Sequence, residues 1–285
     1  MNEIKQMVSV LIPCYNHEKF VADCLKSILN QRYSNYEVII CDDKSDDRSV
    51  DVIWEQKKLF DEQNIRFVVQ KNESNLGITR TINRMLPEAR GEFIKLIASD
   101  DMLMEDYMSD MVVLLNKNPT IQFAFSNCIK VQEDSIYPVT QNKMIVPLLQ
   151  QFPDYKNNVF ERVYLNTFIP APTLIFRKSV LMEMGGYDES IGIEDLEMCL
   201  RILSKYPNGI GALEKSSVYY RCNSNSISSV QKNKGLRKRG YFMYVNSRAI
   251  AKKYRRQVSR KVYYKRMFRL FVAYCGILRQ SILSH

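Results

Sequence analysis

Histidine is scarce in this sequence, and its cysteines stand in no metal-binding pattern. The 285 residues include two His, His17 and His285, and seven Cys scattered singly from Cys14 to Cys275. A structural zinc site needs about four Cys or His ligands at short spacings, so none is expected. The odd, scattered cysteines are typical of small core residues in a reducing compartment rather than of a disulfide framework.

Long hydrophobic runs and glycine-rich phosphate motifs are also missing. The longest apolar run near the end, Leu270 to Leu278, is far shorter than the roughly 20 residues of a transmembrane helix. The first residues, MNEIKQ, carry no apolar segment of a secretory signal, so a cytoplasmic protein is expected. No Gly-x-Gly-x-x-Gly follows Ile12, which disfavours a dehydrogenase, and the lack of a Gly-rich triphosphate loop disfavours a nucleotidyltransferase.

Acidic residues are absent from the last quarter of the chain. From Lys215 to His285 there are 18 Lys and Arg and no Asp or Glu, whereas the preceding residues hold 23 basic and 31 acidic side chains. Tyr, Phe and Met alternate with the cations from residue 231 onward at near-helical spacing. A basic amphipathic helix of this kind favours an anionic membrane surface, with packing against the acidic body as the alternative. Nucleic acid is not expected as a partner, because no recognition module is present.

Apolar segments alternate with helical patterns in the first half of the chain. Pro13 is expected to end the first strand, and a helix is expected directly after Asp101 as far as Lys117. Strands that alternate with helices predict an α/β protein with a mainly parallel central sheet flanked by helices. The predicted strands are residues 7–12, 36–41, 65–70, 92–98 and 121–129.

Acidic and polar residues follow three of the predicted strands. Ligands of parallel sheets lie at the carboxyl ends of the strands, so Tyr15-Asn16, Asp42-Asp43 and Asp100-Asp101 are expected to share one cleft. The adjacent carboxylates of Asp100 and Asp101 repel each other, and Mg²⁺ or Mn²⁺ would relieve that repulsion. The alternative for Asp100-Asp101 is that the pair caps the helix that follows it, and for the Asp42-Asp43 loop that Asp46 or Asp47 caps a helix that starts at Arg48.

Two later motifs also have two interpretations. Glu194-Asp195 opens a helical pattern in which Arg201 is placed to hold a carboxylate, and a carboxylate in a cleft serves as a general base. The alternative is simply an acidic first helical turn. Asn75-x-Gly77 permits close approach of a ligand to the backbone, but by itself favours a turn before a helix.

Taken together and in order, these segments resemble the family-2 glycosyltransferases, which have the GT-A fold. The resemblance covers roughly residues 7 to 230. It rests on VSVLIPCYN, FVADCLKSILNQRYSNYEVIICDDKSDD, NLGITRTIN, GEFIKLIASDD, GGYDE and IEDLEMCLR. It implies a nucleotide-diphospho-sugar transferase fold. Its parts would be a nucleotide-sugar half at 1–129, an acceptor and catalytic-base half at 130–230, and a basic helical extension at 231–285.

The resemblance also implies a role for individual residues. Asp195 matches the catalytic base, Asp43 the contact to the base, with uracil expected, Asp100 the ribose or sugar contact, and Asp101 the ligand of Mn²⁺ or Mg²⁺. Glu194 and Thr173 are expected to contact the acceptor. The donor would further be bound by Pro13, Tyr15, Asn16, Asn75, Gly77 and Arg80.

Two positions depart from the family pattern. Ile82-Asn83 stands where many members have Arg-Asn, so Arg80 is expected to substitute, and Asn223 replaces a histidine of a Tyr-Arg-x-His segment. The implied function is inverting, hexosyl-type transfer from a nucleotide sugar, with a UDP-sugar expected. The acceptor would be a saccharide or lipid-linked saccharide in cell-surface polysaccharide synthesis. The alternative is a non-catalytic nucleotide-sugar or glycan-binding module, which the set Asp43, Asp100, Asp101 and Asp195 disfavours.

Overall fold

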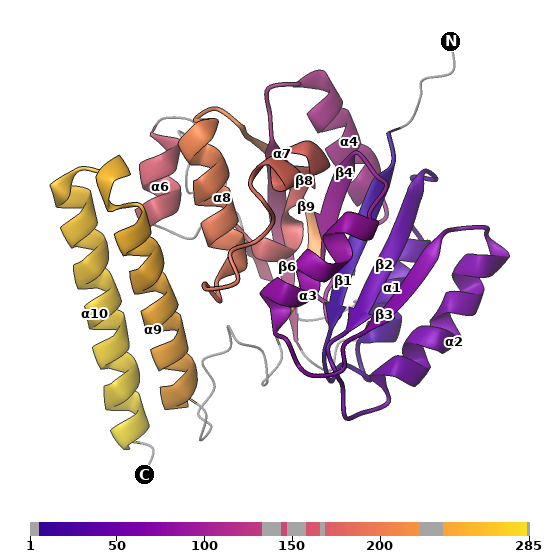
Figure 1. Ribbon diagram of the computed structural model, residues 1–285, viewed down its shortest axis with the longest axis horizontal. Helices are drawn as coiled ribbons and strands as arrows, with labels where there is room; N and C mark the ends of the chain where they lie inside the picture. Colours follow the sequence, from indigo (N-terminus) through magenta and orange to yellow (C-terminus); the bar gives the residue numbers. More distant parts are fainter. Residues whose placement is uncertain (1–5, 133–143, 147–157, 166–168, 223–235, 284–285) are drawn as a thin grey trace.

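The computed structural model describes residues 6–132, 144–146, 158–165, 169–222 and 236–283. A single sheet crosses the molecule in the order β3-β2-β1-β4-β8-β6-β9-β5, and β7 pairs with β6 (Figure 1). The strands are β1 (Val8–Cys14), β2 (Tyr36–Asp42), β3 (Phe67–Lys71), β4 (Phe93–Leu96), β5 (Met102–Leu103), β6 (Phe123–Gln132), β7 (Met144–Val146), β8 (Ile175–Arg177) and β9 (Ile210–Cys222).

Parallel pairing joins β3, β2, β1 and β4, and also β6 with β9. The remaining pairs are antiparallel, so the sheet is parallel in its first half and mixed in its second. The predicted α/β class with flanking helices is confirmed. Strands β1 and β2 are buried along almost their whole length, as expected where helices cover both faces of parallel strands.

Alternate residues of the central strands enter two separate cores. Val8, Val10 and Ile12 of β1 pack toward α1 (Val21–Leu29), α2 (Ser49–Glu62) and α4 (Tyr107–Lys117). Leu11 packs toward the opposite face, because successive side chains of a strand point to opposite sides. That face is covered by α3 (Ile78–Met85), α6 (Val159–Leu165), α7 (Lys178–Glu183) and α8 (Glu194–Lys205).

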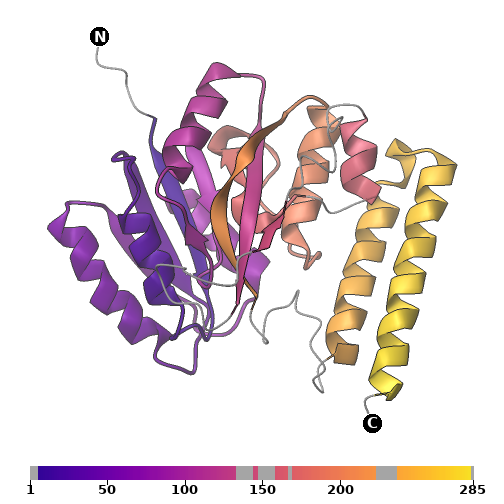
Figure 2. The ribbon, with the colours of Figure 1, turned by 180° about the vertical axis from the view of Figure 1, so that it is seen from behind.

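The chain ends in two long helices, α9 (Leu236–Lys253) and α10 (Arg260–Leu283), which pair as an antiparallel hairpin. Figures 1 and 2 show this hairpin at the end of the molecule opposite α2, with α10 outermost. Helix α9 joins the core through Ile250 and Ala251, and Tyr254 directly after the helix is buried there too. In the described ranges no helix is long and apolar enough to cross a membrane.

Two sequence expectations about local structure are wrong. Pro13 does not end the first strand, which continues to Cys14. Strand β4 flanks β1 only as far as Leu11, so the missing N–H of Pro13 falls where β1 has no neighbour on that side. The second error concerns Asp101. A short strand, β5, follows it directly, and α4 begins only at Tyr107.

Candidate active site

The carboxyl ends of β2, β1 and β4 lie side by side and carry the first three acidic or polar loops. The loop after β1 is hydrogen-bonded to the loop after β2. The backbone N–H of Asn16 donates to Ser45 Oγ (2.9 Å), and Asn16 Oδ1 accepts from the N–H of Asp46 (2.8 Å). Tyr15 is 43% exposed beside them, and Pro13 is aligned with Cys41 in the ladder. Of the three loops expected to converge, Tyr15-Asn16 and the loop after Asp42-Asp43 are therefore seen in contact.

Asp43 binds the loop that forms the next part of the site. Its buried carboxylate accepts hydrogen bonds from the N–H of Leu76 (2.7 Å), the N–H of Gly77 (2.8 Å) and Asn72 Nδ2 (2.7 Å). Asn75 Oδ1 also accepts from the N–H of Gly77, which has a φ of 80° and precedes α3. The turn interpretation of Asn75-x-Gly77 is therefore confirmed. Asp43 fixes this turn against the end of β2, and its contact with a nucleobase stays a prediction.

Asn72 is a polar junction that the sequence reasoning missed. Its buried amide donates to Asp43 and to Thr81 Oγ1 (3.0 Å) and accepts from Arg84 Nη1 (2.6 Å). The signal was its position directly after β3, the same pattern that drew attention to the other loops. Arg80 points elsewhere, because its half-exposed guanidinium pairs with Glu189 (Nε to Oε2, 3.2 Å). The donor role of Arg80 stays a prediction.

Asp100 and Asp101 follow β4 and are 8% and 2% exposed. Arg221 of β9 holds both: its backbone N–H donates to Asp101 Oδ1 and its Nε donates to the carbonyl of Asp100, each at 2.9 Å. The buried Arg221 side chain also pairs with Asp23 (3.1 Å) and lies over the Phe20 ring. Because α4 starts at Tyr107, the helix-cap alternative for this pair is wrong. Helical spacing around Met102 and Leu103 concealed their pairing with β9.

The electrostatics of this pair suit a divalent cation. Burial and the neighbouring Asp100 carboxylate raise the pKa of Asp101 well above its usual range. The N–H of Arg221 and the charges of Lys95 and Arg221 lower this pKa, but by less. Hard carboxylate oxygens of this kind are the ligands that Mg²⁺ and Mn²⁺ prefer. Among the described residues no three His, Cys, Asp or Glu lie together as a metal-binding cluster, and the metal role of Asp101 stays a prediction. Asn223 lies outside the described residues.

Glu194 and Asp195 form the first turn of α8. Burial raises the pKa of both carboxyl groups, and the nearby Asp195 adds to the effect on Glu194. Backbone N–H groups at the helix start act in the opposite direction on Asp195. Arg201 does hold a carboxylate, but it is that of Glu197 (2.7 Å). Arg201 therefore does not pair with Asp195, and the role of Asp195 as a general base stays a prediction.

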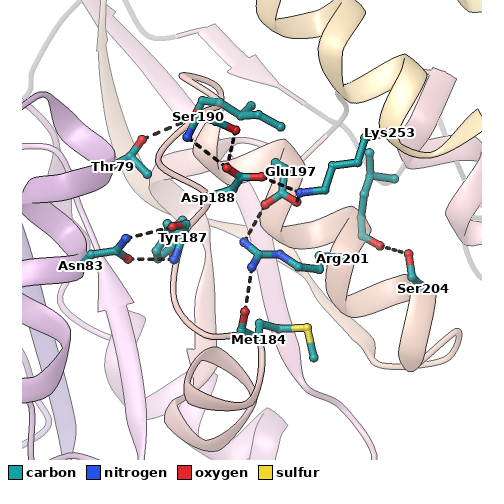
Figure 3. A network of polar contacts seen from close by, with 12 residues as sticks. Thr79, Asn83, Met184, Tyr187, Asp188, Ser190, Glu197, Arg201, Ser204 and Lys253 are labelled. Carbon is teal, nitrogen blue, oxygen red and sulfur yellow. Dashed lines mark hydrogen bonds and ion pairs between the residues drawn. The ribbon is translucent and has the colours of Figure 1, made fainter.

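The loop before α8 is attached to the donor half through α3. Asn83 donates to the carbonyl of Tyr187 (2.9 Å) and accepts from its N–H (2.8 Å), and Thr79 Oγ1 lies 3.5 Å from the carbonyl of Ile191 (Figure 3). Gly185 and Gly186 have φ values of 75° and 78°, a backbone region that favours glycine. Helix α3 thus connects the Asp43 loop at its start with the loop that leads to Asp195.

Thr173 lies deeper than the other predicted residues. It is fully buried, its Oγ1 donates to the carbonyl of Pro170 (2.8 Å), and it accepts from the N–H of Ser126 (3.2 Å). The hydroxyl is therefore used within the protein. A contact of Thr173 with an acceptor stays a prediction, and so does that of Glu194.

Sequence relatives of this chain are described as glycosyltransferases. The sequence from Escherichia coli described as "UDP-Glc:alpha-D-GlcNAc-diphosphoundecaprenol beta-1,3-glucosyltransferase WfgD" is 26% identical over 78% of this chain and 80% of its own length. The "putative teichuronic acid biosynthesis glycosyltransferase TuaG" of Bacillus subtilis is 26% identical over 80% and 84%. An uncharacterized glycosyltransferase of Haemophilus influenzae is 29% identical over 70% of this chain, which spans 63% of that relative.

Solved structures show the same fold. The mannosyltransferase PcManGT from Pyrobaculum calidifontis, in complex with GDP-Man and Mn²⁺, superimposes with a TM-score of 0.67 at 16% identity, over 99% of this chain and 74% of that one. S. aureus TarS 1-349 in complex with UDP-GlcNAc gives 0.60 at 22% identity, over 86% and 65%. The expected GT-A fold is confirmed. The sequence model described as "Glycosyl transferase family 2" matches residues 9–185, more than half of the chain. The chain therefore belongs to glycosyl transferase family 2.

Proposed function

We propose that this protein transfers a hexosyl unit, with inversion, from a UDP-sugar to a saccharide or lipid-linked saccharide in the synthesis of a cell-surface polysaccharide. The observation that carries the proposal is the buried Asp100-Asp101 pair, which Arg221 holds to β9 at the same edge of the sheet that bears Asp43, with β1 between β4 and β2. The setting is supported by relatives named for glucosyl transfer to a diphosphoundecaprenol-linked sugar and for teichuronic acid biosynthesis.

The donor would lie across the ends of β2, β1 and β4. Tyr15, Asn16 and Asp43 would face the nucleoside, with Pro13 shaping the strand end, and Asp100 would contact the ribose or sugar. The turn at Asn75 and Gly77, with Arg80 beyond it, would complete the donor wall. Mn²⁺ or Mg²⁺ held by Asp101 would supply charge stabilisation for the departing diphosphate. The complexes of PcManGT and TarS with nucleotide sugars support this class of donor.

Asp195 would be the general base. An acceptor hydroxyl is a poor nucleophile, so a carboxylate has to remove its proton as the oxygen attacks the anomeric carbon. The raised pKa of Asp195 brings its basicity closer to neutral pH, where proton transfer is most efficient. One base on the face opposite the leaving group gives a single displacement and therefore inversion. Glu194, in the same helical turn, would contact the acceptor.

The outer face of α10 is proposed to bind an anionic lipid surface at the cytoplasmic side of the cell membrane. Tyr264, Phe268, Phe271 and Val272 are 50–68% exposed and share one side of the helix by their spacing. Lys261, Lys265 and Arg269 are exposed among them, and no acidic residue occurs in α9 or α10. Aromatic side chains at the lipid boundary and cations near phosphates stabilise such a helix on an anionic bilayer.

Vesicle co-sedimentation tests this surface. The protein should pellet with phosphatidylglycerol-containing vesicles and not with pure phosphatidylcholine, and Phe268→Ser with Phe271→Ser should reduce pelleting by about tenfold or more. Exposed Val113→Ser on α4 is the matched control. Equal binding to both vesicle types, or no effect of the double substitution, would contradict the proposal.

The transferase activity itself is tested by nucleotide release. The protein is incubated with a panel of UDP- and GDP-sugars and Mn²⁺, with and without saccharide acceptors, and free nucleoside diphosphate is measured. Release from one donor, accelerated by an acceptor and abolished by EDTA, is the expected result. Tight binding of a nucleotide sugar without any turnover would instead favour a binding module.

A further inference from the structure

Helix α9 contacts the loop that leads to Asp195 near both of the loop's ends, at Asp188 and at Gly192. Gly192 donates its N–H to Asn246 Oδ1 (2.6 Å). The Phe242 ring lies against Gly192 so closely that a Cβ atom there would sit 2.3 Å from the ring. Lys253 reaches the start of the same loop. Residues 242, 246 and 253 fall on one face of α9, since they are separated by about one and two helical turns.

Lys253 is the centre of this contact. Its Nζ donates to Asp188 Oδ2 and to Glu197 Oε1, both at 2.6 Å, and thereby joins three elements: the loop, α8 and α9 (Figure 3). Asp188 Oδ1 in turn accepts from the N–H and hydroxyl of Ser190, which fixes the loop's own turn. Glu197 lies within α8, two residues after Asp195, and its carboxylate is 1% exposed.

The surroundings of Glu197 make Lys253 hard to replace. The buried carboxylate also accepts from Arg201 (2.7 Å) and from the Tyr254 hydroxyl (2.7 Å). With Asp188 counted, two carboxylates face two cations, so loss of Lys253 leaves one negative charge uncompensated. A buried charge without its partner is costly, and the local structure moves to bring it to water. The 185–193 loop is the element that can adjust, because it lacks the helical hydrogen bonds of α8 and α9, although its Tyr187 and Ile191 side chains lie in the core.

We propose that α9 positions the catalytic base, with Lys253 and Asn246 holding the loop that sets where Asp195 stands. The inference rests on the proposed function, in which Asp195 takes the acceptor's proton. It assigns the C-terminal hairpin a part in the reaction centre itself, in addition to any surface it binds. Lys253 is a positioning residue: it acts through Asp188 and Glu197 and not on the substrate.

The kinetic test separates positioning from binding. Lys253→Met should lower kcat for nucleotide release from the accepted UDP-sugar by about 10- to 100-fold, because small displacements of a catalytic group cost rates of that order. The KM for the donor should change by less than about twofold, because the donor loops are held by β2 and β9 and not by α9. Lys253→Arg should restore most of the rate, and exposed Lys252→Met should match the wild type.

Asn246 gives a second, uncharged test. Asn246→Asp keeps an acceptor for the Gly192 N–H, and Asn246→Leu removes it. The proposal expects a kcat near that of the wild type for the first variant and a loss for the second. Equal loss in both, or none in either, would overturn the role of this contact.

Hydrogen–deuterium exchange decides the positioning independently of activity. Peptides spanning residues 186–198 should exchange at least several-fold faster in Lys253→Met than in Lys252→Met, with no change at residues 72–85. Unchanged exchange in 186–198 overturns the proposal. Faster exchange in a protein that releases no nucleotide would leave the positioning intact and contradict the transferase function. Full activity in Lys253→Met would contradict only the catalytic consequence.

Discussion

The donor half and the base half hold their carboxylates by different means. Asp43 and Asp101 follow buried parallel strands, and backbone N–H groups of Leu76, Gly77 and Arg221 bind them. The loop before Asp195 lies instead between two helices, α3 and α9, and side chains of these helices bind it. The backbone N–H donors of such a site as the donor half stay in place when the side chain of the residue that carries them is substituted. A loop anchored by a few charged side chains depends on each of them.

The largest effect is expected at the two catalytic carboxylates, one from each half. Asp195→Asn should lower kcat by about 10²- to 10⁴-fold, because it removes the general base. Donor binding, measured by calorimetry with UDP and Mn²⁺, should be unchanged. Asp101→Asn, in contrast, should weaken Mn²⁺-dependent UDP binding. If both variants lost binding equally, the division of labour between the halves would be wrong.

A large stability effect is expected at Arg221, which joins the donor loops to β9. Arg221→Met removes the partner of Asp23 and the donor to the Asp100 carbonyl in a buried position. Breaking a buried pair on one side costs about 3–5 kcal/mol, so denaturant unfolding should show a clear loss. Arg32→Met, at an exposed pair with Glu105 and Asp106, should cost below about 1 kcal/mol. Similar losses in the two variants would contradict the structural importance of Arg221.

The pH dependence should separate the base from the ion pair that holds its loop. The hydrogen bond from Lys253 lowers the pKa of Asp188 to about 2. Burial lowers the pKa of Lys253, but the hydrogen bonds from Lys253 to Asp188 and Glu197 outweigh this effect and raise it. The stability from Asp188 is therefore present above its unfolded pKa of about 3.9 and is lost as the pH falls through about 2. The pKa of Asp195 is raised, so the acidic limb of kcat should lie above the pH at which an ordinary aspartate titrates. A limb that coincides with acid unfolding would contradict Asp195 as the base.

The smallest effects are expected from two glycines with open space around them. Gly77 has a φ of 80°, and a Cβ there would touch nothing within 4 Å, so Gly77→Ala should cost about 1–2 kcal/mol through the backbone alone. Gly276 lies in α10 with equally open space, and Gly276→Ala should stabilise the protein by about 0.5–1 kcal/mol. Equilibrium unfolding of the two variants measures the change in the free energy of unfolding, which should have opposite signs. Destabilisation of the same size at Gly276 would show that its helix is packed more tightly than described.

Much of the donor half was predictable from its sequence. Mostly apolar runs before Pro13, Asp42 and Ser99 predict buried strands, and their observed ends lie within about three residues of the predicted ones. Acidic residues directly after such runs must lie at one edge of a parallel sheet. The resemblance in six ordered motifs added the family, which the sequence comparison confirms. The continuation of β1 through Pro13 was missed, because it depends on where a neighbouring strand ends.

Long-range pairing was beyond the reach of the sequence. Met102 and Leu103 carry a helical pattern, but they form a strand because they pair with the edge of β9. Arg221 of the same strand binds Asp101, although the two residues are 120 positions apart in the sequence. The side chains that hold the Asp195 loop likewise come from α3 and α9, on either side of it in the chain. Periodicity and local spacing report which face of an element is apolar. They do not report which distant element will cover that face, and this choice decided how the carboxylates of the site are held.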